Sequence, residues 1–333
     1  MTRPPLPTAL RPVTGSRGVM SAPVRDYWPM ELELYRGELA AYCYRMLGSF
    51  HEAEDLVQEI MLRAWKAQDR YDPTRASPRT WLYRIATNVC LTALEGRSRR
   101  PLPSGLGAPS NDPAALLTPA FDIPWLQPFP DTRFDIGARA DLRLALVAAM
   151  QVLPPRQRAV LVLREVLEFS AAEVAEQLGT TITAVNSALQ RARATLADVE
   201  DATEVAEPDD PDALAAIQRY IHAFEVADVQ GLVRLLADDA VMEMPPVPLW
   251  YQGSRDYGLF MRRLFAMRGT GWRVRRLSAN GQPAFAAYAP DANGGHRLHT
   301  LQVFTVSRGR IARNVVFADP AVLEAFELPE RIT

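Results

Sequence analysis

Residues 153–196 read LPPRQRAVLVLREVLEFSAAEVAEQLGTTITAVNSALQRARATL, and this stretch predicts three helices separated by short turns. A proline pair opens the first helix, and Ser170 with Glu173 has the pattern of a capping box at the start of the second. Gly179 suits the left-handed residue that commonly ends a helix. The pattern is typical of a helix-turn-helix, and we expect this unit to bind DNA.

The third helix of this unit begins near Ile182 and has two different faces. At about 100° per residue, a narrow arc collects five apolar residues: Ile182, Val185, Leu189, Ala192 and Leu196. The opposite face carries no acid, and short polar groups near a helix start can approach base edges while arginines reach phosphates. The residues expected to contact DNA are Thr181, Thr183, Ala184, Asn186, Ser187, Gln190, Arg191 and Arg193. The alternative is a packed three-helix unit whose polar face is only solvated.

Composition indicates several globular domains. The chain has 333 residues, of which 48% are hydrophobic and 23% charged, a balance unlike that of disordered or membrane proteins. With no apolar run of 18 residues, a cytoplasmic protein without membrane association is expected. The net charge of −2 hides a basic segment, residues 70–100, which holds seven arginines but only two acids. Cys43 and Cys90 are too few for a disulfide framework or a zinc site, so we expect core thiols, no metal and no cofactor.

The chain divides into segments of different character, and the fold class expected is multidomain, with two all-α domains and a C-terminal α+β domain. The boundaries expected are a disordered extension at 1–30, a helical bundle at 31–100, a linker rich in Pro and Gly at 101–136, the helix-turn-helix domain at 137–200, an acidic linker at 201–212 and the α+β domain at 213–330. In the last domain, helices come first and a meander of strands follows.

Helical spacing in residues 31–100 predicts three helices. The first ends at Gly48, and the third begins with Ser77 as its N-cap and a proline in its first turn. The buried residues expected for the second helix are Ala53, Leu56, Ile60 and Ala64, and those for the third are Trp81, Leu82, Ile85, Ala86 and Val89.

The strands expected in the α+β domain are 241–244, 272–279, 284–289, 299–306 and 311–317, with helices around Leu214 to Phe224, around Leu232 to Leu236 and at 254–267. A tight turn at Arg308 and Gly309 joins the last two strands.

Two motifs of the bundle carry a family resemblance. Residues 55–65 (DLVQEIMLRAW) and 81–88 (WLYRIATN), together with the helix-turn-helix, resemble sigma factors of the extracytoplasmic-function type over residues 31–200. The resemblance implies that residues 55–65 bind core RNA polymerase, that the basic third helix helps to melt promoter DNA, and that the helix-turn-helix recognises the upstream promoter element. Thr92 departs from the Asp that family members commonly carry there.

The resemblance supplies two sets of site residues. The polymerase-binding set is Asp55, Gln58, Glu59 and Arg63. The set expected to contact the downstream promoter element is Tyr71, Arg75, Arg79, Arg84, Asn88, Arg97, Arg99 and Arg100. Trp81 has the spacing of a core residue more than that of a stacking surface for an extruded base. The sequence alone also allows a solvated charged face at residues 55–63.

The last domain resembles the SnoaL-like cone fold of polyketide cyclases and ketosteroid isomerases, which a subset of these sigma factors carries. Residues 125–130 (WLQPFP) resemble a linker motif of that subset, expected to contact the tail. We expect no catalytic residue and a domain that regulates the sigma core in cis, with a small-molecule ligand as a possible partner. The alternatives are a cyclase or isomerase using Asp256 or His299 as a base, and a helix-turn-helix repressor or activator.

The expected polymerase-binding set gives a first test. Replacing Asp55, Gln58 and Glu59 together by alanine removes the carboxylates and amide that would meet a basic groove on the polymerase, so affinity for core enzyme should fall at least tenfold. A pull-down with purified core polymerase measures it. If the triple variant binds core polymerase as tightly as the wild type, residues 55–65 are not the polymerase-binding helix.

Overall fold

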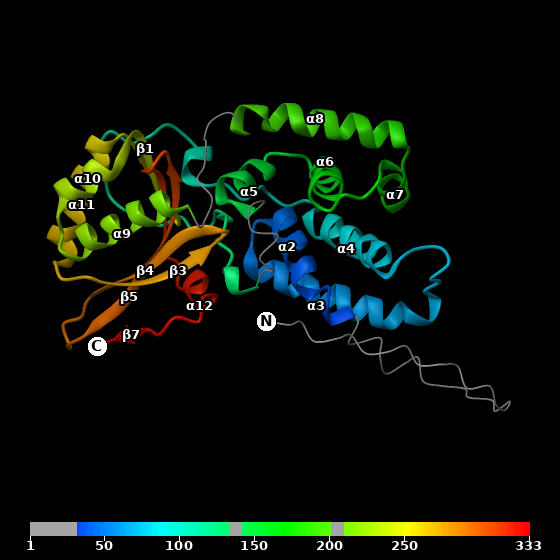
Figure 1. The fold of residues 1–333 in the computed structure, drawn as a ribbon, viewed down its shortest axis with the longest axis horizontal. Coiled ribbons are helices and arrows are strands. Elements are labelled where there is room, and N and C mark those ends of the chain that lie inside the picture. The colour runs from blue at the N-terminus through cyan, green and yellow to red at the C-terminus, as the bar shows by residue number, and fades with distance from the viewer. Residues whose placement is uncertain (1–31, 134–141, 201–209) are drawn as a thin grey trace, which may run out of the picture.

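The structure is a computed structural model that describes residues 32–133, 142–200 and 210–333. The predicted disordered segment 1–30 and most of the predicted acidic linker, 201–212, lie outside the described residues. Three groups of elements follow one another along the chain, and they are coloured from blue to red in Figure 1.

The first two groups are helical, as the sequence predicts. The helical bundle contains α2 (Arg36–Leu47), α3 (Phe50–Ala67), the turn η1 (Gln68–Arg70) and α4 (Pro78–Leu94). The helix-turn-helix domain contains α5 (Leu144–Met150), α6 (Pro155–Leu161), a π-helical continuation (Val162–Val166), α7 (Ala171–Gln177) and α8 (Ile182–Glu200). The linker between them holds the short turns η2 (Pro103–Gly105) and η3 (Asp131–Arg133).

Local signals in the sequence place the helix ends correctly. Gly48 ends α2 with φ 68°, in the left-handed region. Ser77 caps α4 by accepting a hydrogen bond from the backbone N–H of Thr80. Ser170 and Glu173 form both halves of the predicted capping box on α7. These predictions are confirmed.

Several predictions of buried residues are wrong. Ile182 is 51% exposed because it lies at the edge of the apolar arc and in the first turn of α8. In α4 the buried face is rotated toward Tyr83 and Thr87, which leaves Trp81 and Ile85 half-buried. Leu56 of α3 is also half-buried, with Val57 in its place, and Leu214 is exposed.

The C-terminal domain is α+β, as predicted. Its helices are α9 (Pro211–Glu225), α10 (Val229–Leu235), α11 (Ser254–Arg268) and α12 (Pro320–Glu324). Its strands are β1 (Leu236–Met244), β2 (Val247–Gln252), β3 (Arg273–Ala279), β4 (Gln282–Pro290), β5 (His296–Ser307), β6 (Arg310–Phe317) and β7 (Arg331–Ile332). The sequence analysis missed β2, α12 and β7.

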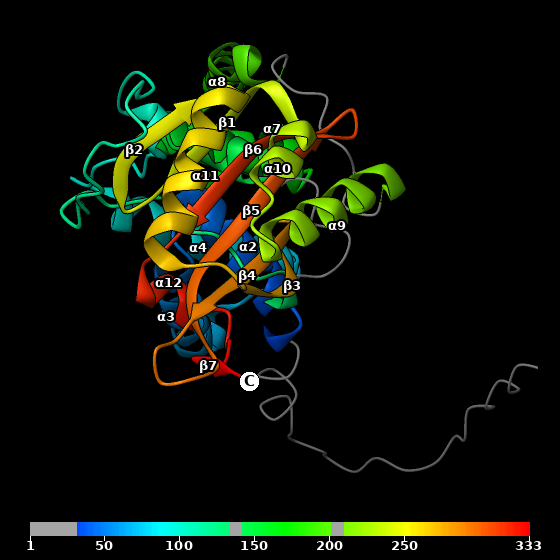
Figure 2. The ribbon, with the colours of Figure 1, turned by 90° about the vertical axis from the view of Figure 1, so that its left-hand side faces the viewer.

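One mixed sheet organises this domain, with strand order β2-β1-β6-β5-β4-β3 and β7 beside β5. Strands β1 and β6 are parallel, and the remaining neighbours are antiparallel. Helices α9, α10 and α11 cover one face (Figure 2). Because side chains alternate across a strand, Phe304 packs under these helices while Val303 points to the opposite face.

The opposite face of the sheet joins the rest of the molecule. Side chains of that face, including Leu301 and Val315, belong to the same apolar core as α2, α3 and the helix-turn-helix domain. The linker contributes Leu126 and Phe129, both fully buried, to this core. The three domains therefore share one continuous core in the described residues.

The turn between β3 and β4 is the meeting point of all parts of the chain. Asn280 and Gly281 have φ 57° and 66°, the values of a tight hairpin turn. The Asn280 amide donates to Tyr44 Oη at 2.8 Å and to the Leu142 carbonyl at 2.7 Å. Its Oδ1 accepts from Phe129 N at 2.8 Å, and its own backbone N–H donates to the Phe129 carbonyl at 2.9 Å. One buried side chain thus connects the bundle, the linker, the helix-turn-helix domain and the sheet.

Asn280→Ala should lower the free energy of unfolding by about 2–4 kcal/mol, because it removes three buried hydrogen bonds and places a Cβ without local compensation in the left-handed region. Urea denaturation followed by circular dichroism measures it. Asn280→Gly should lose the side-chain hydrogen bonds as well, but it should avoid the part of the destabilisation that comes from an alanine Cβ in the left-handed region. Asn293→Ala, in an exposed turn, should stay within about 0.5 kcal/mol of the wild type. Equal stability of the two alanine variants would contradict this role.

Candidate polymerase and nucleic-acid interfaces

Helix α3 presents the predicted polymerase-binding residues on its outer side. Ser49 caps the helix through Glu52 N. Asp55 and Gln58 are exposed, and the half-buried Glu59 pairs with Arg63 at 2.6 Å, one helical turn away. The structure therefore brings the four predicted residues together on one helix, and their role stays a prediction.

Two apolar residues extend this face, and the sequence analysis did not single them out. Leu62 is 43% exposed and Trp65 is 54% exposed. With Asp55 and Gln58 they follow spacings of three, four and three residues, which places all of them along one stripe. An exposed leucine and tryptophan next to a carboxylate is typical of a protein-binding surface. The helical spacing of Leu62 and Trp65 from Asp55 and Gln58 is the sequence pattern that could have identified these two residues.

The predicted downstream-element residues lie on α4 and the loop before it. Arg75, Arg84 and Asn88 are exposed. Tyr71 packs its ring against Trp81, with centroids 5.2 Å apart, and donates a hydrogen bond from its hydroxyl to the Ala76 carbonyl at 3.0 Å. Trp81 is half-buried and packs against the small buried cluster of Leu32, Ala64 and Leu82, so it lies at the edge of the core and not within it.

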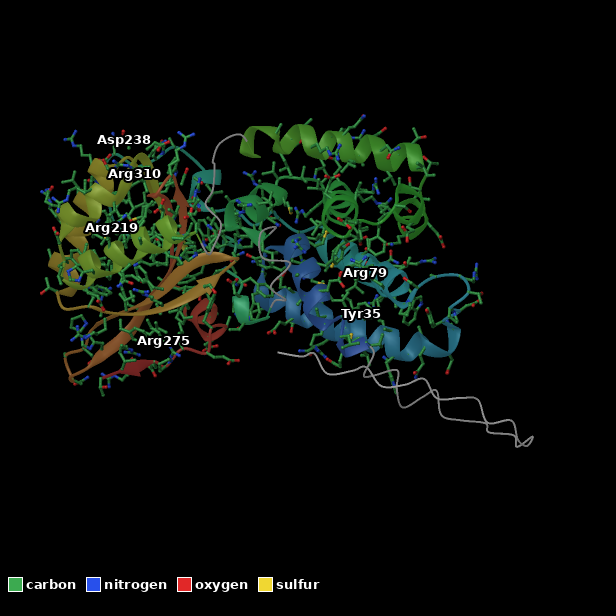
Figure 3. The ribbon with its side chains drawn as sticks, in the orientation of Figure 1. Tyr35, Arg79, Arg219, Asp238, Arg275 and Arg310 are labelled. Carbon is green, nitrogen blue, oxygen red and sulfur yellow. The ribbon has the colours of Figure 1, made fainter. Side chains whose placement is uncertain are left out.

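Arg79 is bound by the helix-turn-helix domain. Its Nη2 pairs with Glu38 at 2.6 Å, and its Nη1 donates to the Leu167 carbonyl at 3.1 Å. The guanidinium lies over the Phe169 ring at 4.7 Å and over the Tyr83 ring at 5.3 Å. Figure 3 shows Arg79, a residue of the first turn of α4, on the side of the helix-turn-helix domain. A side chain predicted to contact DNA is therefore engaged within the chain.

The arginines that follow α4 are also engaged. Arg97 and Arg100 both bind Glu52, at 2.9 and 2.8 Å. Arg100 also donates to the Trp125 carbonyl at 3.1 Å, and Arg99 donates to a carbonyl of the η2 turn at 3.0 Å. These contacts join the basic end of the bundle to α3 and the linker.

The outer face of α8 is open, in contrast to the engaged Arg79 and Arg100 of the bundle. The exposed residues among those predicted to contact DNA are Thr181, Thr183, Ala184, Asn186, Gln190, Arg191 and Arg193, while Ser187 is half-buried. Thr181 also has a structural role, because its hydroxyl accepts a hydrogen bond from Ala184 N at 3.2 Å and so caps the helix. Arg193 pairs with Glu165 at 2.7 Å.

Arg158 fixes the helix-turn-helix domain to the bundle. It is 3% exposed and donates to the Met46 carbonyl near the end of α2. It also bonds Gln151 Oε1 at 2.6 Å, the Gln151 carbonyl at 3.0 Å and the Leu153 carbonyl at 3.1 Å. Every hydrogen-bond partner is neutral, and the negative end of the α2 dipole is the favourable charge nearby. Burial lowers the pKa of Arg158 to about 10, so the side chain stays charged at neutral pH.

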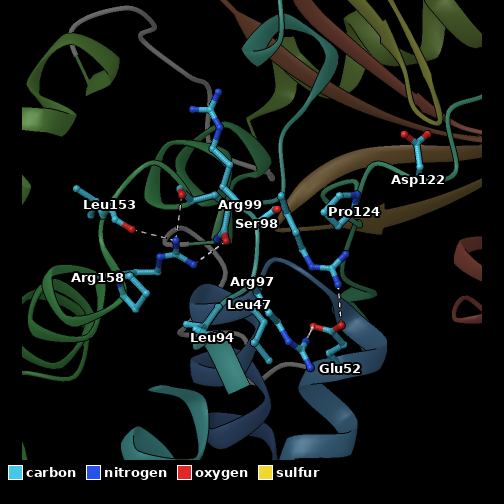
Figure 4. A pocket seen from close by; sticks show the side chains of 13 residues that line it. Leu47, Glu52, Leu94, Arg97, Ser98, Arg99, Asp122, Pro124, Leu153 and Arg158 are labelled. Atoms are coloured by element: carbon cyan, nitrogen blue, oxygen red, sulfur yellow. Dashed lines mark hydrogen bonds and ion pairs between the residues drawn. The ribbon is translucent and has the colours of Figure 1, made fainter. Parts of the chain in front are cut away.

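A cleft of about 460 Å³ lies beside Arg158, between the bundle, the linker and the helix-turn-helix domain (Figure 4). Its charged lining residues are Glu52, Arg97, Arg99, Arg100, Asp122 and Arg158. The ion pairs of Glu52 cross one wall of this cleft.

The predicted contact between residues 125–130 and the tail is confirmed. The Gln127 backbone and side chain bind the bundle through the Gly48 carbonyl, Tyr44 and Ser49. At the other end of the motif, Phe129 exchanges hydrogen bonds with Asn280. The linker motif therefore lies between the bundle and the sheet.

Comparison with known proteins now gives the family. Residues 32–100 match the family model of Sigma-70 region 2, residues 143–196 that of Sigma-70 region 4, and residues 217–314 that of the SnoaL-like domain. The chain is 47% identical over 310 residues to the ECF RNA polymerase sigma factor SigG of Mycobacterium tuberculosis (strain ATCC 25618 / H37Rv), covering 90% of this chain and 83% of that protein. This chain belongs to the ECF RNA polymerase sigma factors. The predicted family and fold class are confirmed.

Two further matches span the whole arrangement. The sigma factor SigJ of the same organism is 27% identical over 320 residues, covering 90% of this chain and 95% of that protein. The crystal structure of Mycobacterium tuberculosis SigJ superposes with a TM-score of 0.64 at 24% identity, covering 90% of this chain and 99% of that one. The fold of this sigma factor is thus shared with SigJ. None of the described helices is long and apolar enough to cross a membrane.

Arg158→Met should lower the free energy of unfolding by about 3 kcal/mol, since it leaves the Met46, Gln151 and Leu153 carbonyls without their donor. Urea denaturation again provides the measurement. Arg156→Met, two residues away and exposed, is the matched control and should change stability by less than about 0.5 kcal/mol. A similar small effect of both substitutions would show that Arg158 does not fix the domains together.

Proposed function

We propose that this sigma factor binds core RNA polymerase through the stripe on α3 and promoter DNA through α4 and α8, in the cytoplasm, and that its own linker and C-terminal domain hold it in a closed arrangement. The division of labour follows the predicted domains: residues 31–100 for polymerase binding and melting, 137–200 for the upstream element, and 213–330 for regulation in cis. The observation that carries the closed arrangement is the capture of Arg79 by Leu167 and Phe169.

Polymerase binding is supported by the composition of the α3 stripe. Asp55 and Gln58 supply polar groups, and Leu62 with Trp65 supplies apolar area that is exposed in the isolated chain. A basic groove with an apolar floor would be complementary to this stripe.

Arg75, Arg84 and Asn88 are already exposed, but use of the whole predicted downstream set needs the closed arrangement to open at α4. Arg79, Arg97 and Arg100 form ion pairs with Glu38 or Glu52, and Arg79 and Arg100 also donate hydrogen bonds to backbone carbonyls. The outer face of α8 remains accessible, so the upstream-element residues can approach the major groove without rearrangement. Opening would therefore increase contacts with the downstream promoter element more than contacts with the upstream element.

A regulatory C-terminal domain is supported over an enzymatic one. His299 lines a cavity of this domain, but Asp256, the other candidate base, lies in the first turn of α11 and does not line that cavity. No carboxylate from the described residues lines it either. The paired carboxylates or the nucleophile with its base that would indicate an active site are therefore not found among the described residues of this lining. We therefore assign this domain no catalysis.

Phe169→Ala tests the proposal in transcription reconstituted with core polymerase. Loss of the ring removes one of the contacts that hold Arg79, leaving those to Glu38 and the Leu167 carbonyl, and should raise transcript yield severalfold. Adding Arg79→Ala should remove the gain. Val152→Ala, an exposed position of the same domain, is the control and should leave the yield unchanged. No transcript above core enzyme alone would refute the sigma role on the promoter used. Equal yields with Phe169→Ala and wild type, at equal polymerase binding, would refute the closed arrangement as a restraint.

A further inference from the structure

The C-terminal domain encloses a cavity of about 190 Å³ between α11 and the sheet. Its walls are mostly apolar, with Met242 and Met244 from β1, Phe260 and Leu264 from α11, and Trp272 before β3. An apolar cavity of about 150 Å³ is enough to hold benzene. The space therefore suits a single ring with one or two additional atoms.

One polar atom of a side chain in the wall lacks a hydrogen-bond partner among the described residues. Asn314 is 1% exposed, and its amide nitrogen donates to Tyr257 Oη at 2.7 Å and to Gln302 Oε1 at 2.9 Å. Its Oδ1 is buried and has no hydrogen-bond partner among the described residues. A buried acceptor without a donor is unfavourable, so a ligand that supplies an O–H or N–H gains from this position.

The charges around the cavity favour a neutral ligand. His299 lines it, and burial, followed by the nearby Arg268 charge, lowers the pKa of this imidazole to about 4. The ring is therefore uncharged at neutral pH. With no lining carboxylate among the described residues, a cation would find no counter-charge. Arg268 also lines the cavity, at its exposed rim, where water and salt screen its charge and weaken its attraction for an anion.

The interdomain linker closes one side of the cavity. Leu117 lines it and packs against the apolar core of the C-terminal domain. The preceding residues are fixed by Arg263, whose Nη1 donates to the Pro113 carbonyl at 2.8 Å and to the Ala115 carbonyl at 2.6 Å. Leu116 beside it is 83% exposed and points away from this core.

We propose that this cavity binds a small neutral ring compound carrying one hydrogen-bond donor, of the phenol class, and that Leu117 of the linker forms part of the binding site. A bound ring would bury Leu117 further and so strengthen the docking of the linker on the C-terminal domain. The site couples the ligand to the segment that joins regions 2 and 4. Any effect of that coupling on transcription rests on the proposed function, whereas binding itself does not.

Calorimetric titration of the full chain with p-cresol tests the site, with toluene and benzylammonium as comparison probes. We expect saturable binding of p-cresol, binding of toluene about three- to tenfold weaker because it lacks the donor, and no binding of benzylammonium. Absence of p-cresol binding up to its solubility, or equal affinities for p-cresol and toluene, overturns the proposal. These titrations contain neither polymerase nor DNA, so their failure is separate from failure of the proposed function.

Two linker variants test the role of Leu117. Leu117→Ala should weaken p-cresol binding about fivefold by removing apolar contact, and the matched control Leu116→Ala should leave it unchanged. Hydrogen exchange at Ser110 and Ala120, whose amides bond Trp250 and Pro246 of the C-terminal domain, should slow when p-cresol is bound to the wild type. Equal affinities of both variants, together with unchanged exchange, would overturn the part assigned to the linker.

Discussion

The arrangement of this sigma factor depends on one buried turn. Asn280 takes the left-handed backbone conformation that a two-residue hairpin requires, and its side chain satisfies polar groups from three other parts of the chain. Because each of these groups is buried, leaving any of them without a partner would be unfavourable, and the four segments must meet in one geometry. The sheet of the SnoaL-like domain is thereby fixed against regions 2 and 4.

The contacts that keep the molecule closed differ in strength. Ion pairs with partly exposed partners, such as those of Glu52 with Arg97 and Arg100, contribute about 0–1 kcal/mol each and are screened by salt. Arg158 and Asn280 are buried, and their hydrogen bonds are correspondingly harder to replace. Phosphates of DNA or acidic groups of a polymerase surface can compete for the arginines of the exposed ion pairs. The buried hydrogen bonds of Arg158 and Asn280 keep the domains in their relative positions. The proposed opening would therefore break the exposed ion pairs and keep the buried hydrogen bonds.

The SnoaL-like sheet has two faces with two uses. One face, with α11, encloses the apolar cavity and the linker residue Leu117, and the other packs on the sigma regions. Strands β5 and β6 contribute side chains to both faces, so the same strands line the cavity side and carry part of the core of the sigma regions.

The sequence by itself determined the helix ends, the helix-turn-helix, the family and most strands, because caps, turns and apolar spacing depend on residues within a few positions of one another. It also placed Asp55 and Gln58 on one helix face. The tertiary structure alone decided that Ile182 is exposed, that Trp81 is only half-buried and that Arg79 lies against the Phe169 ring. Tyr44 and Asn280 meet across 236 residues of sequence, and no local pattern records such a contact. Short-range periodicity fixes which face of an element is apolar, but only packing between distant segments decides what covers it.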